Sequence, residues 1–73
     1  MNKIKNFNLY SYIKYNERVS YTRCFNAIQE FLPHLNNDEV KEELNKKSEL
    51  LLEQGIIRVE SNPVHNKIFV FNH

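Results

Sequence analysis

This chain of 73 residues has little of several features that mark catalytic, secreted or membrane proteins. Cys24 is the only cysteine, so no disulfide can form within the chain and no second thiol is present for a zinc site. Gly55 is the only glycine, which excludes a glycine-rich phosphate loop. No run of eighteen apolar residues occurs, and the beginning, MNKIKNFNLY, lacks an apolar signal-peptide core. We therefore expect a soluble protein of the cytoplasm and/or nucleus, with no membrane partner.

The chain also lacks an excess of charge of one sign. Ten Lys and Arg residues stand against nine Asp and Glu residues, for a net charge of +1. Such a balance does not supply the counterion release by which basic proteins bind nucleic acids. Hydrophobic residues make up 41% of the chain, including four Tyr and five Phe, which favours a packed core over disorder. The length suffices for one small domain, so we expect residues 1–73 to form a single domain.

Apolar spacing predicts two helices in the first half of the chain. The first covers about residues 3–15, where Leu9 and Ile13 lie one turn apart. The second runs from residue 21 to about 32, with Ser20 as its N-cap and a proline after its end. The residues of the second helix expected to face inward are Cys24, Phe25, Ile28, Phe31 and Leu32.

A third helix is predicted over about residues 38–53. Asn36 or Asn37 can cap its N-terminus, and Gly55 can end it in the left-handed conformation. Its expected apolar stripe consists of Val40, Leu44, Leu51 and Leu52, with Lys46 and Lys47 on the outer side.

Two short strands are predicted after the third helix, at 56–60 and 67–71, with a turn at 61–66. Phe69 and Phe71 should share one face of the second strand. This order predicts an α+β winged helix, a three-helix helix-turn-helix core with a small antiparallel hairpin as its wing. The expected core consists of Leu9, Ile13, Phe25, Ile28, Leu32, Val40, Leu44, Leu51 and Ile57.

No residues have the spacing of a catalytic or metal site. The histidines are scattered over a loop, the hairpin tip and the last position, at His34, His65 and His73. Glu42 and Glu43 are neighbours on one helix, an arrangement typical of a solvated face. We therefore expect neither an enzyme nor a bound cofactor or metal.

The charges of the third helix argue against its insertion into DNA. Three lysines and six acids between residues 38 and 53 give it a net charge of 3 − 6 = −3, which repels phosphates. Nucleic-acid binding stays open as an alternative for the N-terminal half, whose five cations outweigh Glu17 and Glu30 by 5 − 2 = +3. These cations are Lys3, Lys5, Lys14, Arg18 and Arg23. The nearby tyrosines are expected to pack against the core or a partner rather than stack on bases, namely Tyr10, Tyr12, Tyr15 and Tyr21.

Three blocks of the chain, YIKYNERVSYTRCFNAIQEFL, NKKSELLLEQGIIRVE and KIFVFNH, together resemble the C-terminal winged-helix domain of cullins. Cullins are the scaffold subunits of cullin-RING ubiquitin ligases. The first block resembles the family's lysine-bearing helix end and following helix, and the second its third helix and strand. The third contains the aromatic pair near which cullins end. The chain would then be either the C-terminal piece of a divergent cullin or a small stand-alone protein.

The resemblance places Lys14 at the lysine to which cullins attach the ubiquitin-like modifier Nedd8 through an isopeptide bond. It implies a regulatory, non-catalytic module, whose partners are the rest of a cullin C-terminal region, its RING subunit, Nedd8 and the conjugating enzyme. Lys3 and Lys5 are alternative acceptors close by. The chain departs from the family after Lys14, where residues 15–17 (Tyr, Asn and Glu) replace the usual basic residues. An unmodified protein-docking winged helix is a further alternative.

Overall fold

The computed structural model describes residues 7–63 and 66–73. Within them the chain forms a small α+β domain of three helices and a three-stranded antiparallel sheet. In chain order the elements are α1 (Leu9–Asn16), β1 (Arg18–Ser20), α2 (Tyr21–Phe31), α3 (Asn37–Glu53), β2 (Ile57–Asn62) and β3 (Asn66–Phe71). No helix of this described part is long and apolar enough to cross a bilayer.

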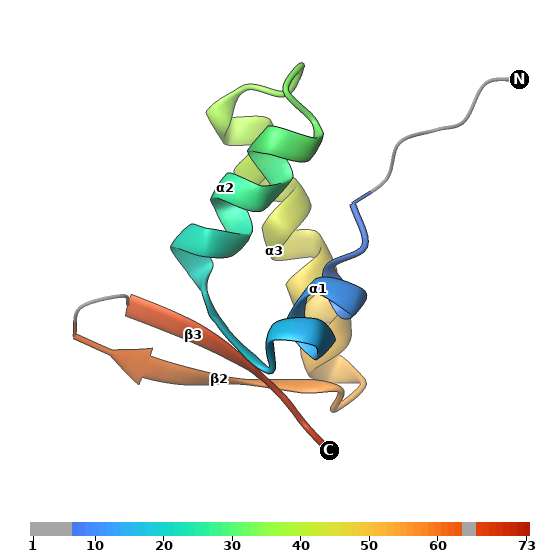
Figure 1. The fold of residues 1–73 in the computed structure, drawn as a ribbon, viewed down its shortest axis with the longest axis vertical. Coiled ribbons are helices and arrows are strands. Elements are labelled where there is room, and N and C mark those ends of the chain that lie inside the picture. Colours follow the sequence, from blue (N-terminus) through green and yellow to red (C-terminus); the bar gives the residue numbers. More distant parts are fainter. Residues whose placement is uncertain (1–6, 64–65) are drawn as a thin grey trace, which may run out of the picture.

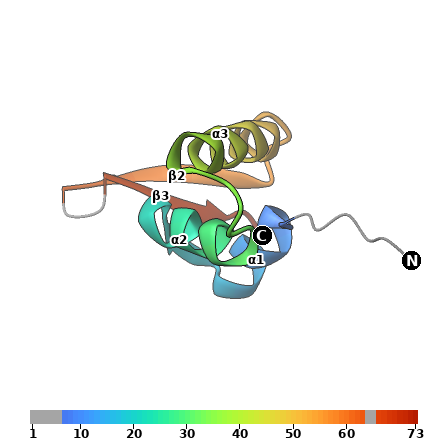
Figure 2. The same cartoon turned by 90° about the horizontal axis from the view of Figure 1, so that it is seen from above.

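The sheet has the strand order β1-β3-β2, so β3 pairs with a neighbour on each side. Phe69 in β3 lies opposite Val19 in β1 and Val59 in β2. In Figure 1 α2 and α3 rise above the strands, and the β2–β3 hairpin extends beyond the helices. Seen from above, the strands run between α3 on one side and α1 and α2 on the other (Figure 2).

The two N-terminal helices begin where a side chain caps them. Asn8 Oδ1 accepts a hydrogen bond from the Ser11 amide at 3.0 Å, and α1 starts at Leu9. The prediction that the helix includes residues 7 and 8 is therefore wrong, and its first part, at 3–6, lies outside the described residues. Ser20 Oγ accepts from the Arg23 amide at 3.2 Å, which confirms the predicted cap of α2.

The third helix begins and ends at the two signals predicted from the sequence, an N-cap and a glycine stop. Asn36 Oδ1 accepts from the Glu39 amide, and Glu39 Oε1 accepts from the Asn36 amide, both at 2.9 Å. This reciprocal pair satisfies two backbone donors that helix formation leaves free. Gly55 follows the helix with φ +72°, the left-handed conformation predicted for it. The two later strands are longer than expected, since β2 reaches Asn62 and β3 begins at Asn66.

We expect Asn36→Ala to lower the free energy of unfolding by about 1 kcal/mol, because it removes the cap of α3. Urea unfolding followed by circular dichroism measures the change. Asn26→Ala is the matched control, because Asn26 is exposed within α2 and caps no helix. Equal losses in the two variants would contradict a specific contribution of the capping box.

The core lies between the helices and the inner face of the sheet. Eight of the nine predicted core residues are buried: Leu9, Ile13, Ile28, Leu32, Val40, Leu44, Leu51 and Ile57. The ninth, Phe25, is only half-buried. Buried residues that the predicted core omitted are Phe7, Val19, Cys24, Phe69 and Val70. Within the helices the predicted core thus includes the half-buried Phe25 and omits Cys24, and it also misses the buried residues of β1 and β3.

Two residues predicted to face inward are exposed instead. Phe31 is 45% exposed and Leu52 is 38% exposed. Each lies at the C-terminal end of its helix, where helical spacing continues beyond the part that another element covers. The buried face of α3 also includes Ser48, whose Oγ donates to the Asn45 carbonyl at 3.1 Å.

Candidate functional site

Lys14 lies in the last turn of α1 with its side chain exposed to solvent. Leu9 and Ile13 hold the other face of this helix in the core. A cation is favoured in a last helical turn, because the free carbonyl groups there carry partial negative charge. The Lys14 amine is therefore presented outward from a helix that is anchored by two buried side chains.

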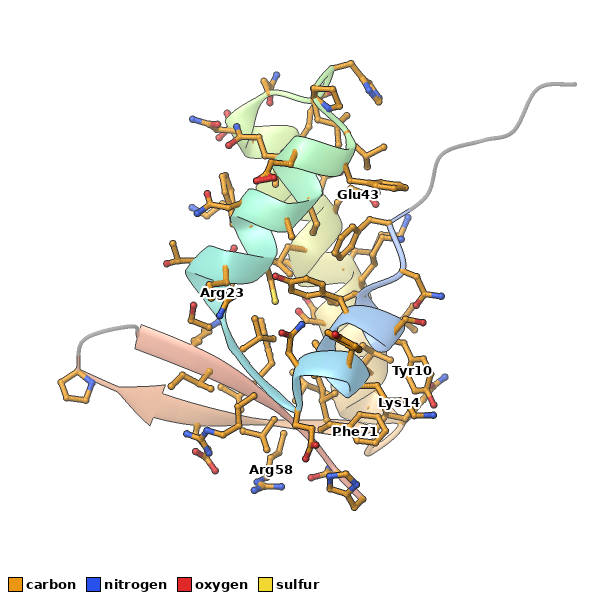
Figure 3. The ribbon with its side chains drawn as sticks, in the orientation of Figure 1. Tyr10, Lys14, Arg23, Glu43, Arg58 and Phe71 are labelled. Carbon is orange, nitrogen blue, oxygen red and sulfur yellow. The ribbon has the colours of Figure 1, made fainter. Side chains whose placement is uncertain are left out.

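An aromatic row connects Lys14 to the C-terminal residues. Lys14 Nζ lies 5.6 Å from the centroid of the Tyr10 ring, a cation–π distance. The Tyr10 ring packs edge-on against Phe71 at 5.9 Å, and Phe71 packs against His73 at 5.4 Å. Figure 3 shows Tyr10, Lys14 and Phe71 grouped at the end of the domain where α1 meets β3. We call Tyr10, Lys14, Phe71 and His73 the lysine surface.

The link between α1 and β1 has an unusual backbone at Glu17. Its φ is 65°, the only positive φ among the described residues other than Gly55. The Glu17 amide donates to the Ile13 carbonyl at 2.7 Å, and its carbonyl accepts from the Phe71 amide at 2.9 Å. Its carboxylate lies 3.1 Å from His73 Nε2. These contacts hold the end of α1, with the backbone of Lys14, against β3.

The four tyrosines differ in how they pack. Tyr12 and Tyr21 are half-buried, and their rings contact Phe7 and Phe69. Tyr10 is 37% exposed and packs on Phe71, so packing against the core describes only Tyr12 and Tyr21. Tyr15 is 88% exposed, and no ring contact is recorded for it within the described residues. A large exposed ring directly after Lys14 is the kind of side chain that anchors protein interfaces.

A groove borders the lysine surface between α1 and the end of α3. Its volume is about 370 Å³, and its walls come from Phe7, Asn8, Leu9, Tyr10, Lys47, Leu50, Leu51 and Gln54. Leu50 on this groove is 53% exposed. Exposed apolar side chains near Lys14 therefore lie on both α1 and α3.

The helix α3 is acidic, as the sequence predicts. All nine charged residues counted in the sequence lie within the helix, so its net charge is 3 − 6 = −3. Lys46 is exposed as expected, whereas Lys47 is half-buried and forms an ion pair with Glu43 at 3.5 Å. The charged side of α3 carries the wrong sign for contact with DNA phosphates.

No cluster of side chains able to hold a metal ion forms in residues 7–63 and 66–73. Nowhere in this part do three or more His, Cys, Asp or Glu side chains gather. His34 is exposed in the loop before α3, and His73 contacts Glu17. His65 and the alternative acceptors Lys3 and Lys5 lie outside the described residues.

Comparison with known proteins identified no relative of this chain. No family model, curated protein or solved structure matches the chain.

Proposed function

We propose that this chain is a cullin-like winged-helix module in which Lys14 accepts Nedd8. The single observation that carries the proposal is the placement of Lys14. Its exposed amine stands at the end of an anchored helix, next to the exposed ring of Tyr15. An acceptor lysine needs this accessibility, because the active site of a conjugating enzyme must reach the amine.

The element order supports the winged-helix part of the proposal. The order α1-β1-α2-α3-β2-β3 and the β1-β3-β2 sheet are compatible with that arrangement. In it, α3 is the helix that DNA-binding members insert into the major groove. The net charge of −3 on α3 favours a protein-docking role over a DNA-reading one.

The chemistry assigned to Lys14 is that of a substrate, not a catalyst. Its deprotonated amine nitrogen attacks the carbonyl carbon of the thioester that joins Nedd8 to the conjugating enzyme. A C–N isopeptide bond forms and the C–S bond breaks. The nitrogen releases one proton, and the thiolate of the conjugating enzyme leaves. By the family resemblance, the modification regulates a ubiquitin ligase scaffold by releasing this module from the RING subunit.

In-vitro conjugation with purified Nedd8 enzymes and the RING subunit tests the proposal. We expect one adduct by intact mass, with peptide mapping placing it on Lys14. Lys14→Arg should abolish the adduct, because a guanidinium keeps the charge but does not act as the nucleophile. Lys41→Arg is the matched control on the exposed face of α3 and should leave the adduct unchanged.

Two results would overturn the assignment. An adduct retained at full yield in Lys14→Arg would place the modification elsewhere, with Lys3 and Lys5 the first positions to map. No adduct with enzymes that modify a known cullin in parallel would favour an unmodified protein-docking module.

A further inference from the structure

A second cavity lies at the free edge of β1, on a different part of the domain from the lysine surface. Its volume is about 370 Å³, and we call it the β1-edge pocket. Its walls come from Arg18, Val19, Ser20, Thr22, Arg23 and Ile68. Two arginines and two residues with hydroxyl groups thus line one small cavity. The residues come from β1, the first turn of α2 and β3, which only the fold brings together.

The backbone of β1 adds hydrogen-bond donors to this cavity. In an antiparallel ladder, residue pairs alternate between pairs that exchange hydrogen bonds and pairs that do not. The Phe71 amide donates to Glu17, so the next bonded pair is Val19 with Phe69. The amides of Arg18 and Ser20 therefore point away from β3, toward the free edge. No backbone bond outside the helices and strands occupies them within the described residues.

The two arginines are held differently. Arg23 is exposed and forms no ion pair with any residue that the structure describes. Figure 3 shows it at the start of α2, above the strands, with Arg58 below them. Arg18 pairs with Glu60 of β2 at 2.9 Å, across β3 from the free edge, and the two side chains are 56% and 37% exposed. Such exposed pairs are weak, so a ligand with a higher charge density can compete with Glu60 for Arg18.

Glu60 keeps a partner if Arg18 turns to a ligand. Arg58 Nη2 lies 3.5 Å from its second carboxylate oxygen, and Arg58 is itself held by Asn72 Oδ1 at 2.8 Å. The outer face of the sheet therefore has two arginines for one carboxylate. This surplus of positive charge lies on the sheet, whereas the surplus of negative charge lies on α3.

We propose that the β1-edge pocket binds a phosphate monoester carried by a partner protein, as a phosphorylated serine or threonine. A phosphate monoester has three terminal oxygens and close to two negative charges, which match two guanidinium groups with additional amide and hydroxyl donors. A carboxylate would leave part of this donor set unused. A nucleic acid would bring many phosphates within reach of the acidic α3, whereas one phosphorylated side chain needs only this pocket.

Titration of ¹⁵N-labelled protein with N-acetyl-phosphoserine amide, followed by NMR, tests the proposal. We expect saturable shifts of the amide signals of residues 18–23, and no shifts with the unphosphorylated compound. Arg23→Gln should weaken binding about tenfold, because one charge-assisted hydrogen-bond partner is lost. Glu60→Gln should strengthen binding about two- to fivefold, because it removes the competitor for Arg18.

Lys41→Gln on α3 is the matched control and should leave the affinity unchanged. The gain expected for Glu60→Gln cannot arise from misfolding, so it tests the pocket even if Arg23→Gln is poorly folded. Absence of saturable shifts at residues 18–23, or unchanged affinity in Arg23→Gln and Glu60→Gln, would overturn the proposal. Tighter binding of a short DNA duplex to the same residues, with an affinity that falls steeply as salt rises, would overturn the proposal and indicate a nucleic acid as the ligand. None of these outcomes depends on Lys14.

Discussion

Phe69→Ala is expected to lower the free energy of unfolding by about 3 to 5 kcal/mol. Phe69 is 2% exposed and lies in the central strand, between Val19 and Val59. Its ring also contacts Tyr21, at 6.2 Å between centroids. Removing it leaves a cavity at the place where all three strands and the helices meet, and the strands on either side prevent the cavity from closing.

A loss of that size threatens the fold, because a domain of this length has a stability of only about 4 to 11 kcal/mol. Urea denaturation gives the difference, with the thermal midpoint as a second measure. Phe31→Ala is the matched control, since it deletes the same ring at a site that is 45% exposed. We expect a clearly smaller loss there. Equal losses at the two positions would contradict the placement of Phe69 at the centre of the core.

The Cys24 thiol is expected to react at least roughly a thousandfold more slowly in the native protein than in the unfolded chain. Cys24 is fully buried. Burial raises the pKa of its thiol from 9.0 to about 12, against a smaller lowering by Arg23. The thiolate is the nucleophile, so a shift of three pKa units reduces its amount about a thousandfold even before steric protection is counted.

Reaction with N-ethylmaleimide at about pH 8, with and without denaturant, measures this protection. A double variant, Cys24→Ala with Ser11→Cys, is the control, because it moves the thiol to an exposed position on α1. Its native and denatured rates should be similar. Fast modification of native Cys24 would show that α2 opens readily or that the thiol is not buried.

The same pKa predicts how stability depends on pH. Below about pH 9 the thiol is protonated in both the folded and the unfolded states, so it contributes no pH dependence. Above pH 9 only the unfolded chain loses the proton, and stability falls by about 1.4 kcal/mol per pH unit until about pH 12. Desolvation also raises the pKa of Tyr21, which acts in the same direction at higher pH. Cys24→Ala should remove the first of these losses and leave the second.

The candidate sites differ in how far the sequence predicted them. Lys14 was singled out by a resemblance, and the structure places it on an exposed helix end. Its aromatic neighbour Tyr10 lies one helical turn away in the chain, but Phe71 and His73 come from the other end. The β1-edge pocket had no signal in the sequence. From the sequence, Arg18 and Arg23 are two of the cations of the N-terminal half, and their common cavity depends on the pairing of β1 with β3.

The sequence by itself determined the local structure of this protein. Helical spacing, the caps at Ser20 and Asn36 and the left-handed Gly55 are interactions within a few residues, so they fix where α2 and α3 begin and end. Only the tertiary structure decided the rest. Three residues are too few for a periodic pattern, so β1 exists because β3 pairs with it, and Val19, Phe69 and Val70 are buried for the same reason. Whether a charged side chain meets a partner or lines a cavity likewise depends on strands that are distant in the chain.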